Sequence, residues 1–152
     1  MNYWLFKTEP ASYSWENLKD AKGKKCVWEG VRNYQARNFM RTMKLGDLGF
    51  FYHSNVKIPV IKGIVSICRE AHPDYFSWQP ESKYYDVAST PENPRWFMVE
   101  LKFEKEFNPP VSRDELKKDF LLSEMELLKK GSRLSVQPVR PEEWKIICDL
   151  RN

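Results

Sequence analysis

The sequence predicts an α+β fold in which short helices pack around a curved, mostly antiparallel, barrel-like β-sheet. Five or so strand-like segments alternate with short helical segments along the 152 residues. Short turns join neighbouring strand segments, which favours antiparallel pairing. The length suits one domain with a sizeable core, and the sequence contains no internal repeat or linker. We therefore expect a single domain over residues 1–152, with a pocket at one mouth of the curled sheet.

The first half of the chain is expected to hold four strands and two helices. The expected strands are 2–7, 26–28, 47–54 and 60–70, with a short helix through Trp15 and Leu18 and a longer one over 34–43. Ser12 or Ser14 caps the first helix, and Gly46 ends the second. Gly63 inside the fourth strand predicts a bulge or the close approach of another backbone.

A long loop and a strand follow. The loop, 73–94, holds four of the ten prolines and many aromatic side chains. Long loops of this kind are more often functional than inert. The next segment, 96–107, alternates apolar and polar side chains as a strand does, and Pro109 and Pro110 are expected to break it.

The last third predicts two capped helices, an edge strand and a final helix. Ser112 and Ser123 each stand three residues before a glutamate, which is the spacing of a capping box. The segment 134–139 is expected to be a strand in which Pro138 marks an edge or a bulge. Pro141 stands where the final helix begins.

The composition is that of a globular protein with a mildly basic surface. Hydrophobic residues make up 41% of the chain, and the formal net charge is +4. That charge is compatible with a nucleic-acid partner, and equally with no polyanionic partner. Aromatic residues reach 14%, so a surplus beyond the core is available to line a concave site.

Cysteine and histidine usage argues against a metal site or a cofactor. Cys26, Cys68 and Cys148 are far apart and form no CxxC pair, and the only histidines are His53 and His72. Three unpaired cysteines suit a reducing compartment. We see no signal peptide and no apolar stretch long enough to span a membrane. We expect a cytoplasmic protein, or a nuclear one if the source is eukaryotic; the lack of a basic N-terminal tail favours a bacterial source.

The sequence provides no positive argument for catalysis. It contains no glycine-rich phosphate loop, no zinc-protease motif and no nucleophile elbow. His53 and Ser54 are consecutive, so on a strand they would face opposite sides of the sheet. His72 has no evident nucleophile for a partner. We therefore do not expect an enzyme.

The stretch 27–41 is where we expect function. Trp28 can stack on a flat ligand, and the amides of Asn33 and its neighbours can donate and accept as the recognition of a base edge requires. Arg37 and Arg41, one helical turn apart, can meet phosphates. The alternative is that Trp28 belongs to the core and the arginines form a solvated helix face.

Six motifs in one order resemble a known family. They are KTEPASYSWENL (7–18), WEGVRNYQARNFMRTMKLGD (28–47), FFYHSN (50–55), HPD (72–74), NPRW (93–96) and GSRLSVQPV (131–139). Together they resemble the EVE domain, a family of the PUA-like superfamily with members in animals and bacteria. The resemblance implies a curved β-barrel and a pocket for a flipped, modified base. Relatives in the superfamily, the YTH domains, bind N6-methyladenosine in an aromatic cage.

Carried over by position, the resemblance implies a set of base-binding residues. They are Trp28, Gly30, Val31, Asn33, Ser54, Asn55, Ser14, Asn17, Trp78, Tyr84, Tyr85, Ser135, Gln137 and Pro138. A basic set lies around the pocket opening in sequence and is expected to hold the nucleic-acid backbone. It comprises Lys22, Lys24, Lys25, Arg32, Arg37, Arg41 and Lys44. The alternative for Gln137 is a structural hydrogen bond to the sheet, and for Ser54 and Asn55 a plain strand end and turn.

Three functions follow from these observations. The leading one is a non-catalytic module, assumed monomeric, that recognises a modified cytosine or adenine in DNA or RNA. The second is a sensor of a free nucleobase or nucleoside that uses the same pocket. The third is an enzyme acting on modified nucleotides, for which Glu29, His53 or His72 would have to be the reactive group.

Overall fold

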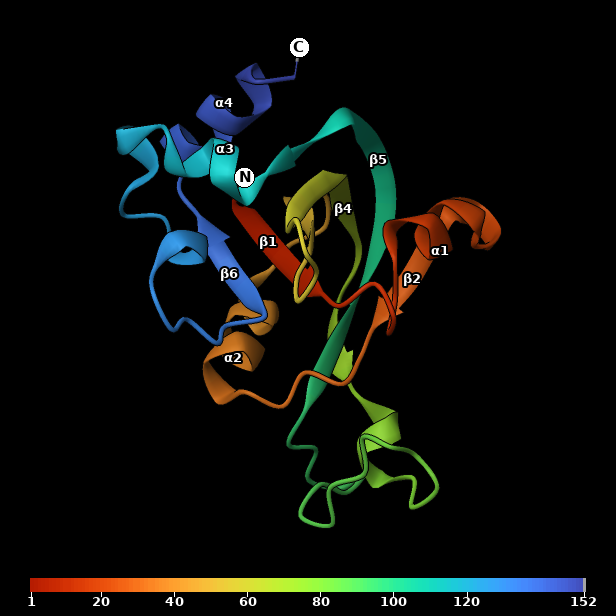
Figure 1. Ribbon diagram of the computed structural model, residues 1–152. Coiled ribbons are helices and arrows are strands. Elements are labelled where there is room, and N and C mark those ends of the chain that lie inside the picture. The colour runs from red at the N-terminus through yellow and green to blue at the C-terminus, as the bar shows by residue number, and fades with distance from the viewer. Residues whose placement is uncertain (152) are drawn as a thin grey trace.

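The computed structural model describes residues 1–151, and its six strands form one sheet (Figure 1). The strands are β1 (Tyr3–Thr8), β2 (Lys25–Trp28), β3 (Leu48–His53), β4 (Val60–Pro73), β5 (Phe97–Ser112) and β6 (Val136–Val139). Their order is β2-β5-β4-β3-β1-β6, and every pairing is antiparallel except the parallel pair β1·β3. The predicted α+β fold with a mostly antiparallel sheet is confirmed. The predicted barrel is not closed, because β2 and β6 end this order and do not pair with each other.

Four short helices and four 3-10 turns accompany the sheet. The helices are α1 (Trp15–Asp20), α2 (Tyr34–Thr42), α3 (Arg113–Lys117) and α4 (Pro141–Asp149). The 3-10 turns are η1 (Lys22–Lys24), η2 (Tyr75–Trp78), η3 (Phe120–Leu122) and η4 (Glu126–Leu128). None of the helices within residues 1–151 has the length and apolar character needed to cross a membrane.

Two predictions about helix ends are wrong. α2 ends at Thr42, and Gly46 instead occupies the following turn with a φ of +87°. The capping box expected at Ser123 opens no α-helix, because Ser123 follows η3 and the chain makes a second 3-10 turn, η4, instead. By contrast, the Ser112 hydroxyl does cap α3, accepting from the Glu115 backbone N–H at 3.1 Å.

Each face of the sheet packs against its own hydrophobic cluster. Consecutive strand residues point to opposite faces, so Leu5 belongs to one cluster and Phe6 to the other. The Phe6 cluster includes Trp15 from α1 and Met40 from α2. The cluster on the other face includes Trp144 from α4. Because side chains are buried on both faces of the sheet, the strands are held in place, and the candidate site lies at the ends of two of them.

The long strand β5 passes through the proline pair that was expected to end it. On β4, Ile61 and Gly63 lie two positions apart, but their partners on β5, Val111 and Glu106, lie five apart. The extra β5 residues, which include Pro109, form a bulge in which a missing backbone N–H breaks no ladder bond. Gly63 lies at this shift in register. A Cβ on Gly63 would meet the Lys105 carbonyl oxygen, so the close approach of another backbone that was predicted at this glycine is confirmed.

Candidate functional site

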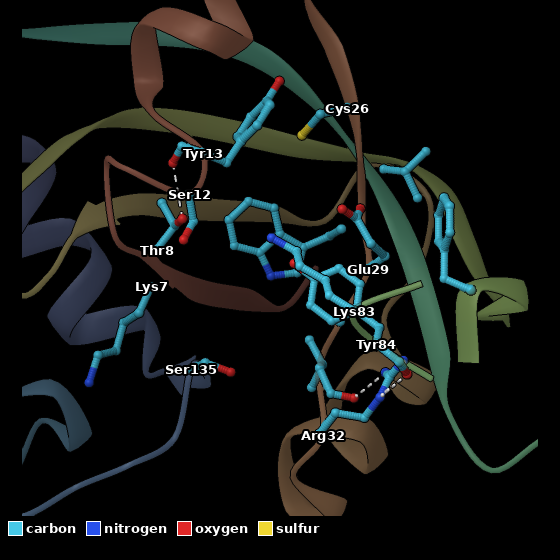
Figure 2. Close-up of a pocket in the computed structure, with 15 residues that line it drawn as sticks. Lys7, Thr8, Ser12, Tyr13, Cys26, Glu29, Arg32, Lys83, Tyr84 and Ser135 are labelled. Atoms are coloured by element: carbon cyan, nitrogen blue, oxygen red, sulfur yellow. Dashed lines mark hydrogen bonds between the residues drawn. The ribbon is translucent and has the colours of Figure 1, made fainter. Parts of the chain in front are cut away.

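A cavity of about 480 Å³ opens where β1 and β2 end, beside the turn 29–32 and the loop between β4 and β5 (Figure 2). Its size is within the ~300–1,000 Å³ of typical ligand pockets. It is lined by Lys7, Thr8, Ser12, Tyr13, Cys26, Val27, Trp28, Glu29, Gly30, Val31, Arg32, Phe76, Lys83, Tyr84 and Ser135. The lining thus mixes aromatic surfaces with hydroxyl, carboxyl and ammonium groups.

Trp28, the last residue of β2, is both part of the core and part of the cavity wall. Its side chain is 8% exposed, and its ring meets Phe6 and Phe51 edge-on at centroid distances of 5.6 and 5.7 Å. These contacts fix the plane of the indole before any ligand arrives. Trp28 is thus a core residue, as one of the two alternatives had it, and because it also lines the cavity, stacking on a ligand remains a prediction for it.

Gly30 makes room for the second aromatic wall. Its φ of +79° suits a residue without a side chain. A Cβ at this position would lie 2.4 Å from the Tyr84 ring, so the ring rests directly on the glycine backbone. Gly30 therefore allows the loop between β4 and β5 to close against the turn after β2.

A buried carboxylate ties that loop to the turn. Asp74 is fully buried and accepts hydrogen bonds from the backbone N–H groups of Gly30 (2.9 Å) and Phe76 (3.0 Å). Arg32 reaches the same carboxylate at 3.1 Å and also donates to the Tyr84 carbonyl oxygen at 2.7 Å. A carboxylate with several donors is stable in a buried place. This cluster holds Tyr84 in position at the cavity.

The opposite wall is made of hydroxyl groups and a thiol. The Thr8 hydroxyl donates to the Tyr13 carbonyl oxygen at 3.0 Å, and the Lys7 backbone N–H donates to the Ser135 carbonyl oxygen at 2.8 Å. The Tyr13 hydroxyl and the Cys26 thiol lie near each other on this wall (Figure 2). Burial raises the pKa of Cys26 to about 12 and also raises the pKa of Tyr13. Both groups are therefore neutral at physiological pH.

Three charged side chains complete the lining. Burial raises the pKa of the Glu29 carboxyl above its usual range, and the negative charge of Asp74 adds to that shift. Burial lowers the pKa of Lys7, assisted by the charge of Arg113. Lys83 is exposed and its ammonium lies 5.1 Å from the centre of the Tyr84 ring. The cavity thus has a shielded acid inside and a solvated cation at its edge.

The structure brings some of the sequence-predicted base-binding residues together. Trp28, Gly30, Val31, Tyr84 and Ser135 all line the cavity. Tyr85 instead lines an adjoining shallow hollow, which shares Tyr84 with the main cavity.

Most of the polar residues in the predicted set have structural partners outside the cavity. Ser14 and Asn17 form the capping box of α1, and Asn33 caps α2 by accepting from the Ala36 backbone N–H at 2.9 Å. Asn55 occupies a left-handed turn with a φ of +55° and donates to Glu9 at 3.2 Å.

The remaining predicted residues also lie outside the lining. Ser54 donates its backbone N–H to the Thr8 carbonyl oxygen at 2.9 Å. Gln137 is buried and donates to the Leu134 carbonyl oxygen at 2.8 Å. Trp78 ends η2 and Pro138 lies on the edge strand β6, and neither lines the cavity.

The predicted backbone-binding set divides in the same way. Arg32 lines the cavity, but its guanidinium is engaged by Asp74 and Tyr84. Arg37 donates to the Arg95 carbonyl oxygen at 2.9 Å, and Arg41 lies over the Phe97 ring. Four exposed lysines, none of which lines the cavity, complete the set: Lys22, Lys24, Lys25 and Lys44.

Sequence reasoning missed several lining residues. They are Lys7, Thr8, Ser12, Tyr13, Cys26, Val27, Phe76 and Lys83, together with Glu29, which was considered only as a reactive group. Lys7 and Thr8 end β1 shortly before a proline, which is a usable signal because strand ends frequently border sites. Phe76 and Lys83 carry no such signal, since their position depends on how the long loop folds back.

Neither histidine takes part in the cavity. His53 is buried, and its Nε2 accepts from the Trp15 backbone N–H at 3.0 Å. His72 also lies outside the lining. Of the three groups considered for an enzyme, only Glu29 reaches the cavity. Residues 1–151 contain no cluster of three or more His, Cys, Asp or Glu side chains that could hold a metal ion.

Comparison with known proteins gives consistent matches over the whole chain. The family model described as EVE domain matches residues 2–150. Thymocyte nuclear protein 1 of Gallus gallus is 40% identical, over 97% of this chain and 68% of that protein. A crystal structure from Pseudomonas syringae is 44% identical, covers 99% of both chains and gives a TM-score of 0.92. Human THYN1, solved in complex with DNA containing 5-methylcytosine, is 37% identical, covers 100% of this chain and 98% of its own, and gives a TM-score of 0.94.

Proposed function

The chain belongs to the EVE domain family, and from this we propose that it is a non-catalytic module that binds DNA carrying a modified base. In this proposal the base leaves the duplex and enters the cavity between Trp28 and Tyr84. The first ligand to test is 5-methylcytosine, because human THYN1 was solved with DNA that contains it. That complex, with a chain similar over the full length of this one, is the observation that carries the proposal.

The aromatic walls supply a reason for a base to bind. Stacking on an aromatic side chain contributes ~1–3 kcal/mol per base, and extruding a base from a duplex costs a few kcal/mol. Trp28 is held by Phe6 and Phe51, and Tyr84 is held through Arg32, so neither ring needs to be ordered on binding. This pre-organisation supports the idea that stacking can offset the extrusion of the base.

The mouth of the cavity supplies a reason for a nucleic acid rather than a free base. Lys83 stands exposed beside Tyr84, and Lys7 also lines the cavity. An extruded nucleotide brings its phosphates to the rim of the pocket that receives it, where such ammonium groups can meet them. We propose that these two lysines, rather than Arg37 and Arg41, contact the backbone nearest to the bound base.

The direct test is a binding titration with duplexes that differ at one base. The duplexes carry cytosine, 5-methylcytosine, 5-hydroxymethylcytosine or N6-methyladenine, as DNA and as RNA. We expect a preference of about tenfold, or about 1.4 kcal/mol, for one modified base over its unmodified parent. Tyr84→Ala should remove this preference, whereas Tyr85→Ala, which changes the neighbouring ring outside the main cavity, should keep it.

Equal binding of modified and unmodified duplexes would refute the proposal. Retention of the preference by Tyr84→Ala would place recognition outside this cavity. Binding of the free nucleoside as tightly as the oligonucleotide would instead favour a small-molecule sensor. Trp28→Ala is a poorer probe, because loss of the buried indole is expected to destabilise the fold by about 3–5 kcal/mol.

A further inference from the structure

Glu29 is the one acidic side chain in the cavity lining. It follows Trp28 on the chain and precedes Gly30, against which the Tyr84 ring packs, so it stands between the contacts of the two aromatic walls. Figure 2 shows its carboxyl between the side formed by Tyr13 and Cys26 and the side formed by Lys83 and Tyr84. Its position inside the cavity puts it within reach of the polar edge of a base that stacks there.

The Glu29 carboxyl has hydrogen-bonding capacity to spare. Within residues 1–151, no other residue forms a hydrogen bond with the Glu29 carboxyl. The nearby Tyr13 and Cys26 side chains carry no charge, and Asp74 already accepts from Arg32 and two backbone donors. A half-buried carboxyl with this capacity is suited to a ligand.

The charged and titratable groups around Glu29 favour the protonated acid. Burial has the largest effect and raises the pKa of Glu29, and the negative charge of Asp74 raises it further. The backbone N–H of Glu29 and, more weakly, the positive charge of Lys83 lower this pKa. Tyr13 and Cys26 remain neutral, since their own pKa values are raised. The remaining cations of the lining are Lys7 and Arg32, and Arg32 is already paired with Asp74.

We propose that Glu29 recognises the Watson–Crick edge of the extruded cytosine as a neutral carboxylic acid. This edge presents an amino donor, N4–H, next to the ring acceptor N3. A neutral carboxyl presents an acceptor next to a donor, so its carbonyl oxygen accepts from N4–H while its O–H donates to N3. An ionised carboxylate has two acceptors and would set one oxygen against the N3 lone pair. The proposal rests on the proposed function and adds the uptake of one proton when an ionised Glu29 binds the base.

The matched variants are Glu29→Gln and Glu29→Ala. A glutamine amide presents the same adjacent acceptor and donor as the neutral acid but does not titrate. The probe is an oligonucleotide with one 5-methylcytosine opposite an abasic site, which removes the differing cost of base-pair opening. A second probe carries thymine, which has the same 5-methyl group. Its N3–H can donate a hydrogen bond to an ionised carboxylate.

Affinity is measured between about pH 5 and pH 8. Between the pKa of Glu29 in the free protein and its higher pKa in the complex, wild-type affinity for 5-methylcytosine should fall with rising pH by up to about tenfold per pH unit, the limit for one linked proton. Glu29→Gln should remove this dependence and bind at the upper pH at least as tightly as the wild type. Thymine should show a smaller pH dependence, and Glu29→Ala should weaken 5-methylcytosine binding at the lower pH, where the wild-type acid is protonated in the complex.

Identical pH profiles for the wild type and Glu29→Gln would overturn the inference, as would wild-type affinity in Glu29→Ala at the lower pH. So would Glu29→Gln binding as weakly as Glu29→Ala. These outcomes are distinct from failure of the proposed function. Cytosine and 5-methylcytosine share the edge that Glu29 meets, so the preference for the methyl group is a separate measurement that Glu29 variants should not change.

Discussion

Gly30 connects the backbone conformation of one turn to the shape of the whole cavity. Its positive φ allows its N–H to meet the buried Asp74 carboxylate, and its missing side chain leaves the space that the Tyr84 ring fills. Any side chain here must both adopt a left-handed conformation and displace that ring. The two effects can be separated by comparison with Gly131, which has a similar φ of +77° but open space where a Cβ would stand, with no atom within 4 Å.

Gly30→Ala should therefore lower stability and DNA binding together. The left-handed conformation alone costs about 1–2 kcal/mol for a residue with a Cβ. Gly131→Ala should show only that loss in urea unfolding, with unchanged affinity for methylated DNA. Gly30→Ala should lose more stability and also bind more weakly, because Tyr84 is pushed from its place. Equal effects of the two substitutions on both measurements would contradict this role of Gly30.

At the scale of single residues, sequence placed the aromatic and glycine positions better than the polar ones. Trp28 and Gly30, for which the family resemblance implied base binding, lie in the cavity lining. Ser14, Asn17 and Asn33 are helix caps. A short polar side chain before a helix can bond either a backbone N–H or a ligand, and the residue type is the same in both cases. Only the three-dimensional path of the chain decides between them.

Helix α2 depends on its first turn for a defined start. Asn33 stands at its N-cap in an extended conformation and accepts from the Ala36 backbone N–H at 2.9 Å. Tyr34, Phe39 and two arginines of the helix are partly or fully exposed, so the buried stripe is narrow and rests on Ala36 and Met40. With little apolar area to hold it, such a helix gains a larger share of its stability from capping.

Asn33→Ala should destabilise the protein by about 1 kcal/mol, the usual contribution of an N-cap. Asn33→Asp should retain most of that stability, since aspartate is an equally good cap at a helix N-terminus. Both variants should keep the preference for modified DNA, because the Asn33 side chain does not line the cavity. Loss of that preference in folded Asn33→Ala would assign Asn33 to recognition instead.

Element by element, local signals were reliable where one residue type has one physical effect. Pro141 begins α4, and the apolar and polar alternation locates β4 and β5, although both strands run further than predicted, to Pro73 and Ser112. Pro109 misled because a proline forbids a ladder hydrogen bond without forbidding a bulge. The parallel pairing of β1 with β3 and the open ends at β2 and β6 have no local signal. They arise from contacts between segments far apart in sequence.

Across the whole molecule, positive charge is largely offset by negative charge. The formal charge of +4 arises from 25 basic and 21 acidic residues, and several cations are paired with neighbouring carboxylates. A molecule of this kind has little long-range attraction for DNA. Binding should then depend on the few cations placed at the cavity mouth, of which Lys83 is exposed.

The salt dependence of DNA binding measures that contribution. Each phosphate contact in a duplex gives a slope of about −0.9 in log affinity against log salt. Lys83→Ala should weaken binding to methylated and unmethylated duplexes alike and reduce the slope by about 1. Lys145→Ala is the matched control: it also removes one surface ammonium, but from α4, whose buried side chains pack in the cluster on the opposite sheet face from Trp28. It should leave the slope unchanged.

An unchanged slope in Lys83→Ala, or an equal reduction in Lys145→Ala, would mean that DNA does not approach through this mouth. A slope near zero in the wild type would mean that the cavity holds its ligand without phosphate contacts, as a binder of free nucleosides would.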